Sequence, residues 1–157
     1  MPSSFSEIFS FAGKLYLIDG KFLWESVPFN GRCFDLGSGY LQLGGEILGA
    51  QPLTKGVYVS DDSGVFFLSG KSFSEFSVQR VSSFPAIPGT FIRVAGHELG
   101  DGMDGEIAMW ACDDGVMIGS EDGLVKNITN RRINFRDCIS GASVFFDGKV
   151  LLSLEVN

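Results

Sequence analysis

The sequence predicts an all-β fold built from antiparallel hairpin repeats, and three observations support this. The 157 residues include 21 glycines and 15 phenylalanines, a composition typical of β proteins with many tight turns. Short apolar runs recur on either side of Asp/Gly turns, where glycine accepts the positive φ that hairpins need. Glycine or proline interrupts almost every window long enough for an amphipathic helix. A chain of this length favours one domain, which we place at residues 1–157.

Four hairpins are predicted, each with two short apolar strands around a turn. The turns are Asp19-Gly20, Asp61-Asp62-Ser63-Gly64, Asp113-Asp114-Gly115 and Asp147-Gly148. The repeats cover residues 13–26, 55–81, 107–129 and 142–156, the second and third including a more polar outer strand at 76–81 and 124–129. The turn glycines are 44, 51 and 33 residues apart, which averages to about the 40–50 of a propeller blade. We therefore predict a β-propeller-like architecture, either partial or small.

The strand interiors predict that the sheets stack on one another. Runs such as Val65–Leu68 and Val144–Phe146 are apolar throughout, which indicates burial on both faces. Each large apolar side chain left exposed forfeits about 1.5–3 kcal/mol, so every sheet, the terminal ones included, is expected to have a cover. Between the repeats, residues 84–90 with two prolines predict a crossing connection, and the glycine-rich stretch 96–106 predicts a surface loop.

Charge and cysteine usage exclude several partners. With 12 basic and 19 acidic residues the net charge is −7, so we expect no direct nucleic-acid ligand. No apolar run reaches the ~18–20 residues of a membrane span, and the N-terminus lacks the pattern of a signal peptide, so we expect no membrane partner. Free thiols are predicted for all three cysteines, Cys33, Cys112 and Cys138, because there is no CxxC and only one histidine.

Patterns of catalytic or cofactor-binding residues are tested and rejected. The segment His97–Asp101 lacks the second histidine of the HExxH motif. The acidic residues of 101–106 do not follow the ligand order of an EF-hand, and the glycines of 37–45 are not followed by a Walker lysine. The sequon Asn127-Ile128-Thr129 is interpreted as part of a polar outer strand. We expect no enzymatic activity, no metal and no cofactor.

Five segments, in order along nearly the whole chain, resemble a known family. They are FAGKLYLIDGKFLWESVPF at 11–29, GVYVS and VFFLSG within 56–70, PGT at 88–90, MWACDDGVMIG at 109–119 and DGLVKNIT at 122–129. They are similar to segments of uncharacterised virion structural proteins of tailed bacteriophages. Longer members carry these segments in their C-terminal half, after further β repeats. One departure is Ser26-Val27-Pro28, which replaces the acidic residue usual before that proline.

The resemblance implies a propeller-like protein with no catalytic residues to carry over. It leads us to expect a non-enzymatic structural component of a tailed-phage virion, located at the tail hub, nozzle or neck and assembled in the host cytoplasm. Its partners would be copies of itself or other tail and neck proteins, in a homo-oligomer or a hetero-assembly. The alternative is a tail module that binds carbohydrate on the host surface through Trp and Tyr faces and the acidic loop 101–106.

Aromatic and basic side chains are the interface candidates. Aromatic residues supply most of the contact energy at interface centres, and a small group of arginines on an acidic chain suits ion pairs with an acidic neighbour. For the aromatic residues the alternative is an ordinary place in the core, and for the arginines it is a solvated face. The candidates are Phe5, Phe9, Phe11, Trp24, Phe29, Arg131, Arg132 and Arg136.

Overall fold

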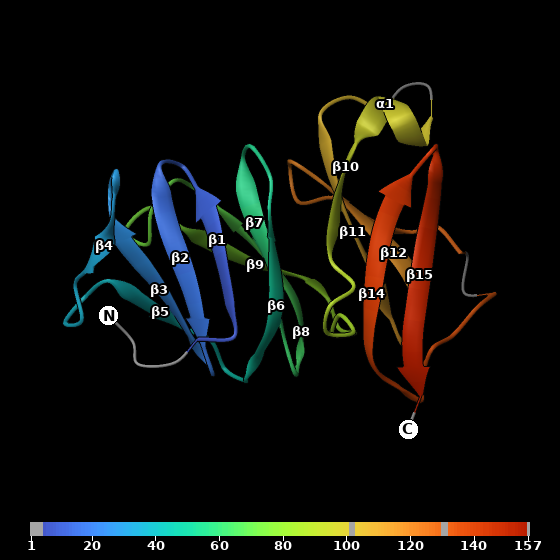
Figure 1. The fold of residues 1–157 in the computed structure, drawn as a ribbon, viewed down its shortest axis with the longest axis horizontal. Coiled ribbons are helices and arrows are strands. Elements are labelled where there is room, and N and C mark those ends of the chain that lie inside the picture. Colours follow the sequence, from blue (N-terminus) through green and yellow to red (C-terminus); the bar gives the residue numbers. More distant parts are fainter. Residues whose placement is uncertain (1–4, 101–102, 130–131, 157) are drawn as a thin grey trace.

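The computed structural model describes residues 5–100, 103–129 and 132–156 of the chain. These residues form four antiparallel β-sheets, which lie side by side in chain order (Figure 1). The all-β class is therefore confirmed. The four sheets do not close into a ring, barrel or propeller within the described ranges.

The first three sheets have four or five strands each, and the last has two. The first sheet contains β1 (Glu7–Phe11), β2 (Lys14–Asp19), β3 (Phe22–Val27), β4 (Asn30–Phe34) and β5 (Tyr40–Gln42). The second contains β6 (Ile47–Pro52), β7 (Gly56–Asp61), β8 (Gly64–Ser69) and β9 (Ser77–Ser82). The third contains β10 (Ile92–Ala95), β11 (Glu106–Cys112), β12 (Gly115–Ser120) and β13 (Val125–Asn127). The fourth is the hairpin of β14 (Cys138–Phe146) and β15 (Lys149–Val156).

The four predicted hairpins are present, but they do not all occupy the same position in their sheets. The first three are β2–β3, β7–β8 and β11–β12, which join the second strand of a sheet to the third. The fourth, β14–β15, joins a first strand to a second: β14 lies beside β10, just as β1 and β10 lie beside β6. This shift explains why the last spacing between turn glycines is the shortest.

Three apolar layers between the sheets form the core. The layer between the first and second sheets includes Tyr16, Ile18, Leu23, Val57 and Leu68. The next layer centres on Tyr58, Phe67 and Trp110, and the last on Ile107, Met109 and Ile118 with Val150 packed against them. Strand β7 is buried along its whole length, and β11 is buried except at its first residue. This double burial confirms that the continuous apolar runs belong to stacked sheets.

The last hairpin departs from the predicted burial on both faces. Burial alternates along β14 and β15, so only one face of this hairpin is covered by the described residues. On the other face, Val144, Phe146 and Leu151 are 51%, 71% and 55% exposed. The described residues therefore cover one face of Val144–Phe146, and the cover expected for the other face stays a prediction.

The predicted surface loop at 96–106 contains one turn of helix, α1 (Gly96–Leu99), which the glycine content did not predict. The helix ends at Leu99, and the next residue, Gly100, has a φ of 152°, which L side chains rarely adopt. A hydrogen bond from Gly96 N–H to the Gly105 carbonyl joins the two ends of this loop. The crossing predicted at 84–90 is observed, and its Ala86 pairs with Cys112 in an isolated bridge.

Candidate functional site

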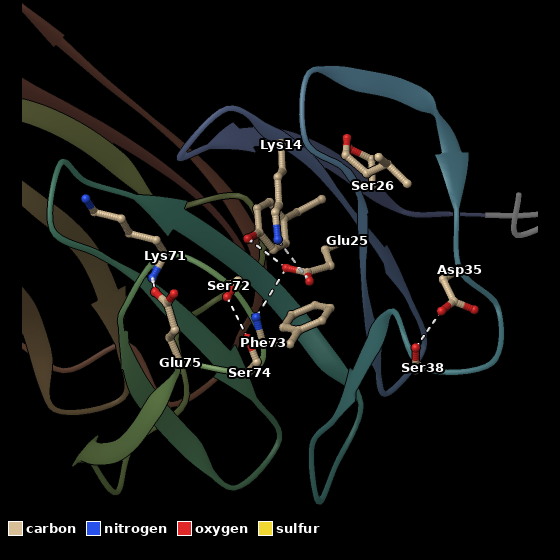
Figure 2. A network of polar contacts seen from close by, with 12 residues as sticks. Lys14, Glu25, Ser26, Asp35, Ser38, Lys71, Ser72, Phe73, Ser74 and Glu75 are labelled. Atoms are coloured by element: carbon tan, nitrogen blue, oxygen red, sulfur yellow. Dashed lines mark hydrogen bonds and ion pairs between the residues drawn. The ribbon is translucent and has the colours of Figure 1, made fainter.

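A groove on the first sheet, with a volume of about 550 Å³, is lined by charged, hydroxyl and aromatic side chains. Its walls come from β2, from β3, from the connection between β4 and β5, and from the loop between β8 and β9 (Figure 2). The lining residues that carry polar or aromatic side chains are Lys14, Glu25, Ser26, Asp35, Ser38, Tyr40, Phe73 and Ser74.

Glu25 is the centre of a polar network in this groove (Figure 2). Its Oε1 lies 3.1 Å from Lys14 Nζ, and both side chains are largely buried, at 15% and 11% exposure. Its Oε2 accepts hydrogen bonds from the Tyr16 hydroxyl and from the Phe73 backbone N–H, each at 3.2 Å. The network therefore joins β2, β3 and the loop after β8.

The register of the first hairpin brings this network together. Tyr16 and Glu25 are directly opposite one another across β2 and β3. Lys14 lies two residues before Tyr16 and so on the same face of the sheet. Burial, and then the negative charge of Glu25, raise the pKa of Tyr16 well above its ordinary value. Tyr16 therefore stays a protonated donor at any ordinary pH, and Glu25 is held by three donors.

The hydroxyl and carboxylate groups at the rim of the groove serve local turns. Hydrogen bonds from the Ser38 hydroxyl at 2.5 Å and the Gly37 N–H at 2.9 Å lower the pKa of the exposed Asp35 carboxyl. The Ser26 hydroxyl accepts a hydrogen bond from Leu15 N–H at 2.9 Å and donates one to the Val27 carbonyl at 3.1 Å. Each of these groups is hydrogen-bonded to a neighbouring group of the chain, and none of these hydroxyls is paired with a general base.

Metal ligands are not gathered at any point in the described ranges, where no group of three or more His, Cys, Asp or Glu side chains is placed to hold an ion. The acidic loop lies partly outside these ranges, at residues 101–102. Its described end is engaged, because Glu106 forms an ion pair with Arg93 at 3.3 Å. The three cysteines are free, with Cys112 buried, and burial raises the pKa of its thiol.

The predicted aromatic interface residues are not brought together in one patch. Phe11 is buried in the first core layer, and Phe9 stacks on Tyr16 with ring centroids 5.3 Å apart. These two therefore have the core position that the sequence left open as the alternative. Trp24 lies opposite Leu17 and Tyr40 on the other face of the first sheet.

The remaining candidates lie at the surface. Phe5 is 46% exposed and Phe29 is 93% exposed, Phe29 with a positive φ of 57° in the turn between β3 and β4. Arg132 and Arg136 are exposed, whereas Arg131 lies outside the described residues. The interface roles of Phe5, Trp24, Phe29 and the arginines stay predictions.

The sequence did not identify the network around Glu25. Part of the network could have been predicted from the sequence, because counting back from the turn at Asp19-Gly20 places Tyr16 opposite Glu25. The hydrogen bond from Phe73 could not have been predicted. It joins residues 48 positions apart, one in the first sheet and one in a loop of the second.

A comparison of the chain with models of known protein families finds no match, and neither does a comparison with curated proteins. None of the helical residues described forms a helix that is long and apolar enough to cross a membrane. The chain is therefore an all-β protein of stacked antiparallel sheets, with a polar groove on its first sheet.

Proposed function

We propose that this chain is a non-enzymatic structural component of a tailed-phage virion, at the tail hub, nozzle or neck. It acts by assembling with copies of itself or with partner tail proteins, and the assembled sheets form a propeller-like arrangement. The virion context comes from the resemblance of five segments to phage structural proteins. The assembly role is supported by the geometry of the sheets.

The order of the strands supports the propeller-like arrangement. In a propeller, each blade is a four-stranded antiparallel sheet whose first strand lies nearest the axis. Here the first strands β1, β6, β10 and β14 are neighbours of one another in space, and the following strands of each sheet lead away from them. Further sheets added after β14–β15 would continue the same stack.

The observation that carries the assembly role is the apolar face of the last hairpin, which none of the described residues covers. Val144, Phe146 and Leu151 form a continuous apolar surface, with Val144 directly opposite Leu151. Burying a side chain of this size is worth about 1.5–3 kcal/mol. A partner that covers this face therefore gains several kcal/mol, and large exposed apolar patches mark interaction sites.

The groove supports a structural rather than a catalytic role. Its most buried carboxylate, Glu25, is fixed between Lys14, Tyr16 and the Phe73 N–H. A general base needs a free lone pair directed at a substrate proton. The network instead ties the first sheet to the second.

Analysis of purified virions tests this proposal. We expect mass spectrometry to detect the chain at a stoichiometric copy number in virions of the phage that encodes it, and we expect density for its stacked sheets in the tail or neck. Virions that lack the chain would overturn the proposal.

Carbohydrate binding is the second candidate, and an exposed aromatic face beside the groove favours it. Tyr40 is 40% exposed and lies with Trp24 on the face of the first sheet opposite to Glu25, with ring centroids 5.1 Å apart, and the connection that leads to it carries the exposed Asp35 carboxylate. Aromatic faces beside carboxylates and hydroxyls can stack on and hydrogen-bond a sugar. A glycan array with the wild-type chain and Tyr40→Ala tests this: binding that is lost in the variant supports it, and an array without binding rejects it.

A further inference from the structure

The first three sheets place three residues at equivalent positions of their second and third strands, on the face that packs against the following sheet. In the first sheet these are Lys14, Tyr16 and Glu25, with Tyr16 directly opposite Glu25 and three positions before the last paired residue of β2. Counting in the same way from the end of β7 and of β11 gives the other two sets. They are Gly56, Tyr58 and Phe67 in the second sheet, and Ile107, Met109 and Ile118 in the third.

The second and third sheets fill this place with apolar packing. The Phe67 ring lies over Gly56, where a Cβ would overlap it, and Gly123 from the third sheet approaches the same ring just as closely. The set of the third sheet forms the centre of the last core layer. The fold therefore does not require charged side chains at this position.

The first sheet instead has an ion pair here, between Lys14 and Glu25, and both side chains are largely buried. Burying two charges costs desolvation energy that their attraction does not always repay, and apolar side chains of similar volume often stabilise a fold as well or better. Beside this pair lies the groove of about 550 Å³ (Figure 2). Because the other two sheets do without the charges, their presence beside a groove points to a ligand.

The ammonium group of Lys14 has donors to offer to such a ligand. An ammonium group carries three N–H donors. Among the described residues, Glu25 is the one partner of Lys14 Nζ. Two donors are therefore left for acceptors on a ligand, and Lys14 lines the groove. The exposed Asp35 carboxylate, which only accepts, lines the same groove.

These groups select a neutral ligand that is rich in hydroxyl groups. Glu25 already neutralises Lys14 and Asp35 adds a negative charge, so an anion is disfavoured. The ligand has to present acceptors to Lys14 and donors to Asp35, and a hydroxyl group does both. Leu41 and Phe73 give the groove an apolar wall for the C–H groups of a sugar ring. The volume lies within the range of about 300–1,000 Å³ of small-molecule sites.

The main chain at the groove favours a sugar over a peptide. Strand addition needs main-chain donors that are still free. Here Glu25 N–H donates to the Gly39 carbonyl, and Leu15 N–H donates to the Ser26 hydroxyl, each at 2.9 Å. Both donors are therefore already used within the chain.

We propose that this groove binds a neutral saccharide, with Lys14 donating to its hydroxyl groups and Asp35 accepting from them. The site is separate from the face of Trp24 and Tyr40, which lies on the other side of the first sheet. The inference deepens the carbohydrate-binding candidate and rests on it, but it is independent of the virion role.

A glycan array probed with the wild-type chain and two double variants tests the site. Lys14→Met/Glu25→Gln removes both charges and keeps a hydrogen-bond acceptor at position 25. The matched control, Lys55→Met/Glu121→Gln, removes an ion pair that joins the second and third sheets and does not line the groove. Urea unfolding verifies that each variant is folded.

We expect the wild-type chain and the control to bind neutral glycans. The Kd for the free oligosaccharide of the strongest spot, measured by calorimetry, should rise about tenfold or more in Lys14→Met/Glu25→Gln, because hydrogen bonds to a charged group are lost. Amide chemical shifts of the wild-type chain give a second readout that needs no variant. Addition of the oligosaccharide should shift the amides of Lys14, Glu25, Ser38 and Phe73.

Three results would overturn the proposal: an array without binding to a neutral glycan, the same Kd in the two double variants, or shifts at Trp24 and Tyr40 in place of the groove. The first result removes carbohydrate binding altogether. The third moves the saccharide to the aromatic face and keeps carbohydrate binding as a function. The virion role is judged separately, from the composition of virions.

Discussion

At the scale of single residues, Glu7 and Glu25 show how the surroundings of a carboxylate decide its effect on the fold. Glu25 has an ammonium group, a phenol and a backbone N–H as partners. Glu7 on β1 has the Ala50 N–H of β6 at 3.2 Å, and burial raises the pKa of its carboxyl above the ordinary value. We therefore expect removal of the charge to have opposite effects at the two positions.

Glu25→Gln is expected to lower the free energy of unfolding by about 1–3 kcal/mol, because it leaves the largely buried Lys14 without its counter-charge and weakens two accepted hydrogen bonds. Urea unfolding at pH 7 measures this. The matched control is Glu46→Gln, an exposed position, where we expect a change within about 0.5 kcal/mol. Equal stability of the two variants would show that the network does not stabilise the fold.

Glu7→Gln is expected to raise the stability at pH 7, because the amide still accepts from Ala50 N–H without a buried charge. The folded state raises the pKa of Glu7, so it binds the proton more tightly than the unfolded state does. The contribution of this group is then greatest at low pH and declines as pH rises from the unfolded pKa, about 4.3, through the folded one. The difference between variant and wild type should therefore shrink to zero towards pH 3. A Gln variant less stable than wild type at pH 7 contradicts this.

At the scale of the elements, the turn between β1 and β2 carries a conformational cost that one substitution should remove. Ala12 has a φ of 48°, a region that alanine disfavours and that asparagine and aspartate tolerate. The last hairpin has Asp147 at the same position, with a φ of 50°. We expect Ala12→Asn to raise the melting temperature and to stabilise by about 0.5–1 kcal/mol. Ala12→Val should destabilise, and a Val variant as stable as the Asn variant would refute the turn assignment.

The interface between the second and third sheets depends on close approach at Gly119. A Cβ at this position would overlap the Tyr58 ring, whose hydroxyl donates to the Ser120 carbonyl at 2.7 Å. Tyr58 is fully buried against Phe67 and Trp110. Gly119→Ala is therefore expected to cost about 1–3 kcal/mol in urea unfolding. Gly44→Ala, where no atom lies within 4 Å, serves as the control and should be close to neutral.

The elements that the sequence predicted are those whose signal is local. An Asp-Gly turn between two apolar runs specifies a hairpin within about twelve residues, and all four such hairpins are present. The first strands β6 and β10 were missed because Gly49, Gln51 and Arg93 interrupt their apolar pattern.

The position of a hairpin within its sheet, and the groove around Glu25, depend on contacts between sheets. The turn at Asp147-Gly148 has the same residue types whether it joins a first strand to a second or a second to a third. Only the packing of β14 beside β10 decides between these positions. In the same way the Glu25 carboxylate depends on the Phe73 N–H, which no local pattern indicates.

At the scale of the whole molecule, the stack of sheets predicts a gradient of stability. Strands β7 and β11 are covered on both faces and paired on both edges, whereas β15 is covered on one face and paired on one edge. Local opening is easiest where few apolar contacts and exposed hydrogen bonds coincide.

Native-state hydrogen exchange of the isolated chain should therefore be slowest at the amides of β7 and β11, which open only with global unfolding. Among strand amides, exchange should be fastest at Val150, Leu152 and Leu154 of β15, whose N–H groups point away from β14 and face no other described strand. Glu25→Gln should accelerate exchange of the β7 and β11 amides in proportion to its loss of stability. It should leave the exchange of the β15 amides unchanged. Protection of the three edge amides that grows with protein concentration would contradict this gradient, since it would mean that copies of the chain already cover the edge.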